Sequence, residues 1–221
     1  MKEIPKDIIR EYRFHLIADR ETQCPFCGAA RRNSNAIRET GGRWKSSLIM
    51  YGTVYGTSKL YAQELSKLTG IEAKSYEEVT SIDGCETIVY IGSLYAGGVM
   101  GMKKTFSKLS DTNDKKIIIA TVGLSDPSDE ENTYHIKSSI ITQLSEEVYS
   151  QAVIFHLRGA IDYSKLGLKH KTMMKLLYNK AKNLPEEKKN AEVMAMIETY
   201  NKQVSFVDFE SLAPVVESIL V

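Results

Sequence analysis

Five short apolar segments, separated by stretches of helical periodicity, constrain the fold of this chain more than any other feature. They occupy residues 48–51, 71–76, 87–91, 116–121 and 152–157. Segments of this length that are rich in β-branched residues predict strands buried on both faces. Strands that alternate with helices form a parallel sheet covered by helices on both sides. The sequence therefore predicts an α/β fold with a doubly wound, five-stranded parallel sheet.

The segments between these strands predict the covering helices. Apolar residues recur at helical spacing in residues 58–69, 100–109, 134–149 and 209–220. Gly70 directly follows the first of these ranges, and glycine is favoured just beyond a helix C-terminus. Residues 162–201 separate the fifth strand from the last helix. We expect them to form a helical insertion, placed before the last helix of the fold.

The loop between the first strand and the first helix has the composition of a phosphate-binding loop. It reads Y-G-T-V-Y-G-T-S-K from Tyr51 to Lys59. Its glycines let backbone N–H groups converge, and the following helix adds free N–H groups and the positive end of its dipole. It lacks the Gly-Lys-Ser/Thr ending of a Walker loop and the third glycine of a dinucleotide fingerprint. It predicts a site for a phosphate monoester, with an ordinary Gly/Ser/Thr turn as the alternative.

The pattern Y-G-T-x-x-G-x-[ST] after a first strand resembles the FMN phosphate loop of flavodoxins. The resemblance implies FMN as the cofactor and places its flavin ring between the loops after the third and fourth strands. The phosphate-loop residues are Thr53, Val54, Tyr55, Gly56, Thr57 and Ser58. The ring-binding residues are Ser93, Leu94, Tyr95, Ala96, Gly97, Gly98, Val122, Gly123 and Leu124. Leu94 and Tyr95 offer apolar or flat faces to a planar ring, and the glycines allow the backbone to approach it closely.

The last part of the chain resembles the branch of flavodoxin-domain proteins that includes the menaquinone-dependent protoporphyrinogen dehydrogenases. The fifth strand ends in R-G-A-x-x-Y, from Arg158 to Tyr163, and a lysine- and methionine-rich insertion follows. Residues 204–210 then read V-S-F-V-D-F-E. The resemblance covers residues 47–221. After the third strand, S-L-Y-A-G-G stands where that branch has a Tyr/His-rich segment, so the substrate is left open.

Three functions are compatible with these patterns. The first is an FMN-dependent oxidoreductase that passes electrons between a hydrophobic or anionic substrate and a quinone-type acceptor. The second is a flavodoxin-type electron carrier. A carrier that docks on basic reductases should be markedly acidic, whereas residues 45–221 carry 20 basic and 22 acidic side chains. The third is an interaction module that has lost its flavin, which the intact hydroxyls of the phosphate loop disfavour.

The insertion concentrates positive charge. Residues 163–184 contain six lysines and neither aspartate nor glutamate, and apolar residues interleave with the lysines. Such a basic amphipathic helix is typical of a surface that meets an anionic partner or membrane headgroups. The alternative is a solvated lysine face whose apolar side packs on the core. The candidate partner-binding residues are Arg158, Lys169, Lys171 and Lys175. Arg158 is included because its planar guanidinium suits a carboxylate.

The overall composition indicates where in the cell the protein is found and which classes of partner it does not attract. The formal net charge of +1 gives no general attraction to nucleic acid. Three cysteines do not make a disulfide framework. No apolar run approaches the roughly 20 residues of a membrane span. We expect a cytoplasmic protein that, through its insertion, contacts the inner face of the membrane peripherally.

The N-terminal segment differs in composition from the rest of the chain. Seven of the eight arginines precede residue 44, so we place a domain boundary at Lys45 and expect residues 1–44 to be an appendage that folding and flavin binding do not need. Cys24 and Cys27 form a C-x-x-C pair, which can be half of a zinc site or a redox pair. His15 is the only further candidate ligand nearby, and we therefore predict a loosely ordered arm without a metal.

Overall fold

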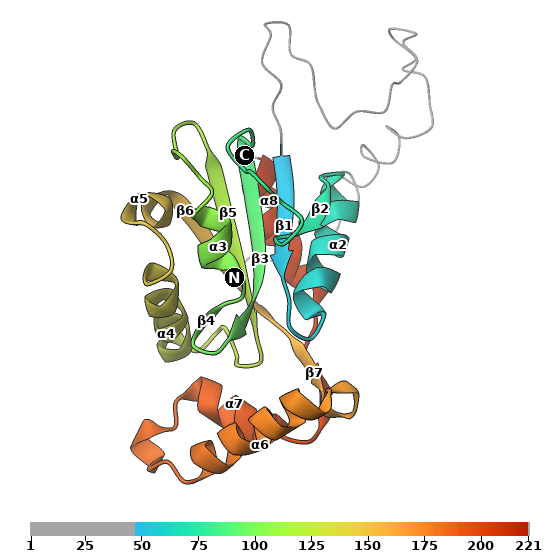
Figure 1. Ribbon diagram of the computed structural model, residues 1–221, viewed down its shortest axis with the longest axis vertical. Coiled ribbons are helices and arrows are strands. Elements are labelled where there is room, and N and C mark those ends of the chain that lie inside the picture. The colour runs from blue at the N-terminus through green and yellow to red at the C-terminus, as the bar shows by residue number, and fades with distance from the viewer. Residues whose placement is uncertain (1–46, 221) are drawn as a thin grey trace, which may run out of the picture.

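The computed structural model describes residues 47–220 (Figure 1). The predicted appendage, the boundary at Lys45 and the Cys24–Cys27 pair lie outside the described residues. None of the helices in residues 47–220 combines the length and the apolar character that a bilayer crossing requires.

A parallel sheet forms the centre of the fold, as the strand pattern predicts. Its five parallel strands are β1 (Ser47–Gly52), β2 (Ala73–Ser75), β3 (Thr87–Tyr95), β5 (Lys116–Gly123) and β6 (Ala152–Arg158). They are ordered β2-β1-β3-β5-β6. The chain moves outward in one direction from β1 to β2 and in the other direction from β3 to β6. This reversal lies between β1 and β3, and ligands of doubly wound sheets bind at the carboxyl ends of strands at such a point.

Each face of the sheet is covered by helices, because alternate residues of each strand point to opposite faces. On one face, Ile49, Val89 and Ile118 pack with side chains of α2 (Thr57–Thr69) and α8 (Ala213–Leu220). On the other face, Met50 and Tyr90 pack with side chains of α3 (Met102–Phe106), α4 (Glu130–Ile141) and α5 (Glu146–Gln151). The prediction of a sheet buried on both faces is therefore confirmed.

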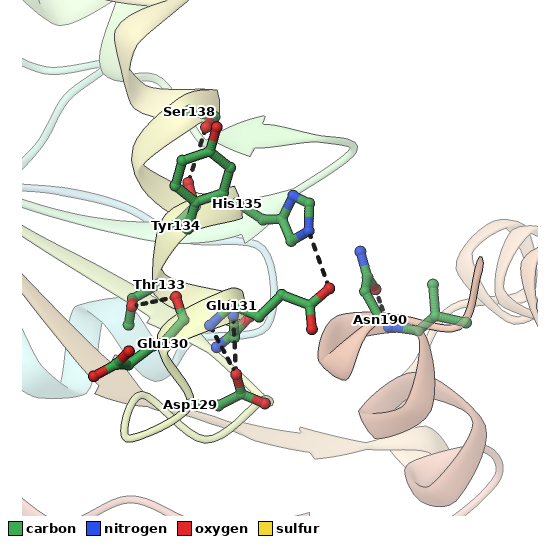
Figure 2. Close-up of polar contacts among 10 residues, drawn as sticks. Asp129, Glu130, Glu131, Thr133, Tyr134, His135, Ser138 and Asn190 are labelled. Carbon is green, nitrogen blue, oxygen red and sulfur yellow. Dashed lines mark hydrogen bonds and ion pairs between the residues drawn. The ribbon is translucent and has the colours of Figure 1, made fainter. Parts of the chain in front are cut away.

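The predicted helix at residues 134–149 is wrong in extent. Residues 134–149 were predicted as a single helix, but α4 begins at Glu130 and ends at Ile141, and α5 starts again at Glu146. The side chain of Asp129 begins α4, because its Oδ1 accepts the backbone N–H groups of Glu131 and Asn132 at 2.9 and 3.2 Å (Figure 2). Ser145 caps α5 in the same way through the N–H of Val148.

The region after β3 also departs from the prediction. β3 runs on to Tyr95 and turns back as a short antiparallel strand, β4 (Gly98–Val99), through Ala96 and Gly97. Both turn residues have positive φ, 51° and 78°, as a tight two-residue hairpin requires. The helix predicted at 100–109 is therefore only Met102–Phe106. The last predicted helix is also divided, into a 3-10 turn, η3 (Phe209–Leu212), and α8.

The predicted insertion is helical and lies beyond the carboxyl ends of the strands (Figure 1). It contains η1 (Tyr163–Lys165), α6 (Leu168–Lys182), η2 (Glu186–Lys188) and α7 (Ala191–Thr199). Two antiparallel strands that were not predicted, β7 (Ala160–Asp162) and β8 (Gln203–Ser205), connect it to the sheet domain. α7 contacts α4, and Figure 2 shows Asn190 at the start of α7 near the first turn of α4.

Candidate functional site

The predicted phosphate loop joins β1 to α2 at the carboxyl edge of the sheet. Gly56 precedes α2 with a φ of +92°, and its N–H donates to Thr53 Oγ1 at 2.9 Å. The first N–H groups of a helix have no partner within the helix, and no side chain caps α2. The turn at Gly56 therefore leaves the N-terminus of α2 with N–H groups that can hold an anion.

The two hydroxyls at the start of α2 tie the loop to distant parts of the chain. Ser58 is fully buried, and its Oγ lies 2.7 Å from Oγ of Ser93, at the end of β3. Thr57 Oγ1 donates to the carbonyl of Ala160 in β7 at 3.3 Å. A hydroxyl has one donor and two acceptor positions. Thr57 Oγ1 also accepts the N–H of Ala160 at 3.4 Å, so it keeps one acceptor position, whereas the Ser58 hydroxyl can donate to another group when Ser93 donates to it. The structure thus joins the predicted phosphate loop directly to a predicted ring loop.

The turn between β3 and β4 is held by α4 and the residues that follow it. Ser139 Oγ donates to the carbonyl of Gly97 at 2.7 Å, and Gln143 Oε1 accepts the N–H of Val99 at 3.2 Å. A Cβ at Gly98 would lie 1.9 Å from Nε2 of Gln143, which explains why glycine stands there. Ser139 and Gln143 could not be predicted from the sequence, because no local pattern links them to residues more than forty positions earlier.

The two predicted ring loops contact each other. A Cβ at Gly123, at the end of β5, would lie 2.7 Å from Cδ1 of Leu94. Val122 is buried beside Gly123, and the partly buried Leu124 follows. The three loops predicted to form one site, after β1, β3 and β5, therefore do converge at one edge of the sheet.

The insertion packs over all three of these loops. The rings of Tyr55 and His170 meet edge to face, with centroids 5.9 Å apart. Tyr95 Oη donates to Sδ of Met173 at 3.4 Å. Leu124 belongs to an apolar cluster built around residues of β7, η1 and α6. α6 thus contacts Tyr55 and Tyr95, while Leu124 packs against the cluster that α6 shares with β7 and η1. The side chains of α6 that face the loops were not among the predicted cofactor-binding residues.

Tyr55 is enclosed by this packing. Burial raises the pKa of its phenol, so the group stays neutral at physiological pH. Its Oη is buried and has no hydrogen-bond partner among the described residues. A buried hydroxyl without a partner is uncommon in proteins and indicates a place where a ligand or water can supply one.

A cavity of about 440 Å³ opens between the phosphate loop and the insertion. Its walls include Val54, Tyr55 and Thr57 from the loop and Lys165 and His170 from the insertion. The cavity therefore joins the N-terminus of α2 to two side chains that can donate hydrogen bonds to an anion.

Arg158 lies at the end of β6 and binds the loop after β5. Its Nη2 donates to the carbonyl of Leu124 at 3.2 Å, and its Nη1 lies 3.8 Å from Oδ2 of Asp126. The guanidinium also stacks 3.9 Å from the ring centroid of Phe206. Hydrogen bonds from Ser128, with a smaller contribution from Arg158, lower the pKa of Asp126, so its carboxylate stays charged. Arg158 therefore holds one of the predicted ring loops, and it is adjacent to Leu124 of the candidate site.

The predicted partner lysines lie on the outward part of α6. Lys169, Lys171 and Lys175 are all exposed. Lys171 Nζ donates to the carbonyl of Ser164 at 3.3 Å. Leu168 and Leu176 stand among them with 82% and 66% of their surface exposed. The alternative in which the apolar side of this helix packs on the core therefore holds only in part, because these two leucines face outward.

Comparison with known proteins finds similarity to flavodoxins. A family model described as a flavodoxin domain matches residues 48–188, from β1 to the end of η2. The chain is 20% identical to a cysteine-to-alanine mutant of flavodoxin from Pseudomonas aeruginosa, covering 59% of this chain and 92% of that one, with a TM-score of 0.35. It is 18% identical to a mutant flavodoxin from Fusobacterium nucleatum bound to flavin mononucleotide, covering 55% of this chain and 72% of that one, with a TM-score of 0.34. No curated protein matches the chain.

Proposed function

Because this chain belongs to the flavodoxin domain family, we propose that it binds FMN at the carboxyl ends of β1, β3 and β5 and transfers electrons through it. The observation that carries this proposal is the convergence of the three loops. Ser58 joins the first to the second at 2.7 Å, and Leu94 packs against Gly123 of the third.

The residues present fit this cofactor. The N-terminus of α2 offers uncapped N–H groups to the phosphate, and a Cβ built at Gly56 meets no atom within 4 Å. Gly56 therefore borders open space. Leu94 and Tyr95 supply the apolar and aromatic surfaces that a flavin ring requires. When bound, FMN supplies the one- and two-electron chemistry, while the protein holds it, orients it and excludes water.

We further propose that α6 meets the redox partner, and that this partner is a quinone-type or other hydrophobic molecule at an anionic membrane surface. Two outward leucines flanked by lysines are the arrangement expected of a helix that lies in a membrane interface. Lysines of the insertion would contact lipid phosphates while the leucines enter the acyl boundary. A flavodoxin-type carrier remains the alternative, favoured only if a soluble protein proves to be the acceptor.

Arg158 is our candidate for recognising a carboxylate of the substrate. The side chain is 32% exposed, and its Nε has no partner among the described residues. Asp126 lies near one end of the same guanidinium and would compete with a substrate carboxylate. We therefore propose that Arg158 mainly holds the loop after β5 in place, and that recognising a substrate carboxylate is its secondary role.

Electron transfer to vesicle-borne quinone tests this function. FMN-loaded protein, reduced chemically, should be reoxidised faster by menaquinone in anionic phosphatidylglycerol vesicles than by the same quinone in neutral phosphatidylcholine vesicles. Changing Lys169, Lys171 and Lys175 together to Glu should remove that preference and vesicle binding while leaving FMN affinity unchanged. Added salt should act on the wild type in the same direction, because charges on exposed groups are screened over about 8–10 Å.

The matched control changes the same three lysines to arginine, which preserves charge and should keep both vesicle binding and reoxidation. Full reoxidation and vesicle binding by the glutamate variant, at every salt concentration, would show that these lysines are only a solvated surface. Reoxidation by a soluble acceptor protein but by no quinone would favour the electron carrier.

A further inference from the structure

We propose that the inward side of the insertion forms a fourth wall of the FMN site, with Lys165 and His170 at the phosphate end and Met173 at the ring end. This inference rests on the proposed function and adds residues that neither the loop pattern nor the family match assigns. It gives the insertion two roles that adjoin at Met173, because Met173 also borders the outward hollow lined by Leu168, Leu176 and Leu177.

The phosphate end is defined by the cavity that the loop and the insertion share. Thr57 and Tyr55 line it from the loop, and Lys165 and His170 line it from the insertion. Between residues 53 and 58 the loop has no basic side chain, and the nearby Lys59 is exposed and does not line the cavity. The insertion therefore brings to the loop donors that the loop itself lacks.

Both side chains line this cavity, but they are held differently, since the side chain of Lys165 is 81% exposed. Lys165 Nζ lies 3.4 Å from Oδ2 of Asp162, whose Oδ1 accepts the N–H of Ser164 at 2.9 Å. Asp162 also lines the cavity, and Lys165 offsets its charge. His170 is fixed by its edge-to-face contact with Tyr55. An imidazole can donate from at least one ring nitrogen in either protonation state, and an ammonium has three donors.

The ring end is defined by Met173 and Tyr95. The Tyr95 hydroxyl donates to the Met173 thioether at 3.4 Å, which holds the methionine against the loop that would carry the ring. Its neighbour Met174 is only 8% exposed and packs in the cluster that includes Leu124. A flexible, polarisable thioether makes favourable contacts with flat aromatic surfaces. Met173 therefore suits the face or edge of a flavin ring.

Comparing FMN with riboflavin separates the two ends, because riboflavin lacks the phosphate. Dissociation constants for both should be measured by flavin fluorescence quenching on the full chain. Changing Lys165 and His170 together to Gln should weaken FMN about tenfold or more and leave riboflavin unchanged, since the lost hydrogen bonds are charge-assisted. Met173→Ala should weaken both flavins, by about threefold or more, and shift the visible spectrum of bound FMN.

Two controls accompany these variants. Lys180→Gln removes a lysine from the far end of α6 and should bind both flavins like the wild type. Lys165→Arg keeps the positive charge and should weaken FMN less than Lys165→Gln does, which separates loss of charge from damage to the fold. Circular dichroism of each flavin-free variant checks that the insertion remains helical.

Failure of this inference differs from failure of the proposed function. A wild type that binds no FMN refutes the proposed function and this inference with it. A wild type that binds FMN, with Lys165, His170 and Met173 variants that match it for both flavins, overturns only the fourth wall. Equal weakening of FMN and riboflavin by the Lys165/His170 variant overturns the phosphate assignment.

Discussion

Replacing Ser58 with alanine should weaken FMN binding by roughly ten- to a hundredfold. Ser58 is fully buried at the first turn of α2 and lies 2.7 Å from Ser93 Oγ. The change removes a hydroxyl from the phosphate cradle and also unlinks two of the three loops. A lost hydrogen bond to a charged group costs roughly 1.5–3 kcal/mol. Thr53→Ala and Thr57→Ala should act in the same direction, and fluorescence titration with FMN measures all three.

Thr69→Ala is the matched control for these changes. Thr69 lies in the same helix, but its hydroxyl donates to the Leu65 carbonyl at the opposite end from the loop. FMN affinity of this variant should equal that of the wild type. If the three loop variants bind FMN as tightly as the Thr69 control, the loop does not hold the phosphate.

Replacing Gly52 with alanine should destabilise the fold by about 2–3 kcal/mol. Gly52 ends β1, and a Cβ there would lie 2.0 Å from the carbonyl oxygen of Met100 and 2.6 Å from Oη of Tyr90. The first of these atoms belongs to the backbone, so the segment after β4 must shift to make room. Forcing an extra methyl group into a close-packed site typically costs about 1–3 kcal/mol. Urea unfolding of the flavin-free protein measures the loss.

Gly84→Ala provides the comparison, since a Cβ at Gly84 meets no atom within 4 Å. Its free energy of unfolding should stay within about 0.5 kcal/mol of the wild type. A Gly52→Ala protein with the stability of the Gly84 variant would contradict the close approach of β1 to the β4–α3 segment.

The strands of the sheet could be predicted because their signal is local. Residues 88–91 of β3 and 117–120 of β5 are continuous apolar runs, and their side chains are buried on both faces of the sheet. The loop between β1 and α2 could be predicted equally well, because its glycines and hydroxyls stand between a strand and a helix. Its phosphate-binding role stays a prediction. The break between α4 and α5 could not be predicted, because Ile140, Leu144 and Val148 keep helical spacing across it. The helix is nevertheless interrupted there, because Ser145 caps a new helix by accepting the N–H of Val148.

Contacts between distant segments account for what the sequence could not predict. The β3–β4 turn places Ala96 at a φ of 51°, which a non-glycine residue rarely adopts. Bonds from Ser139 and Gln143 hold that turn. The pairing of β7 with β8 joins three-residue strands across the whole insertion. Which side of α6 faces the loops depends on how that hairpin docks the helix, so the contacts of His170 with Tyr55 and of Met173 with Tyr95 could not be predicted.

The central claim is that the three loops bind FMN, and direct titration tests it most simply. The full chain, freed of flavin, should take up one equivalent of FMN, with quenched flavin fluorescence and a shifted visible absorbance band. It should bind FAD more weakly, because the site offers one phosphate loop and the sequence shows no second nucleotide-binding pattern. Binding of neither flavin, or FAD binding as tight as FMN binding, would contradict the account.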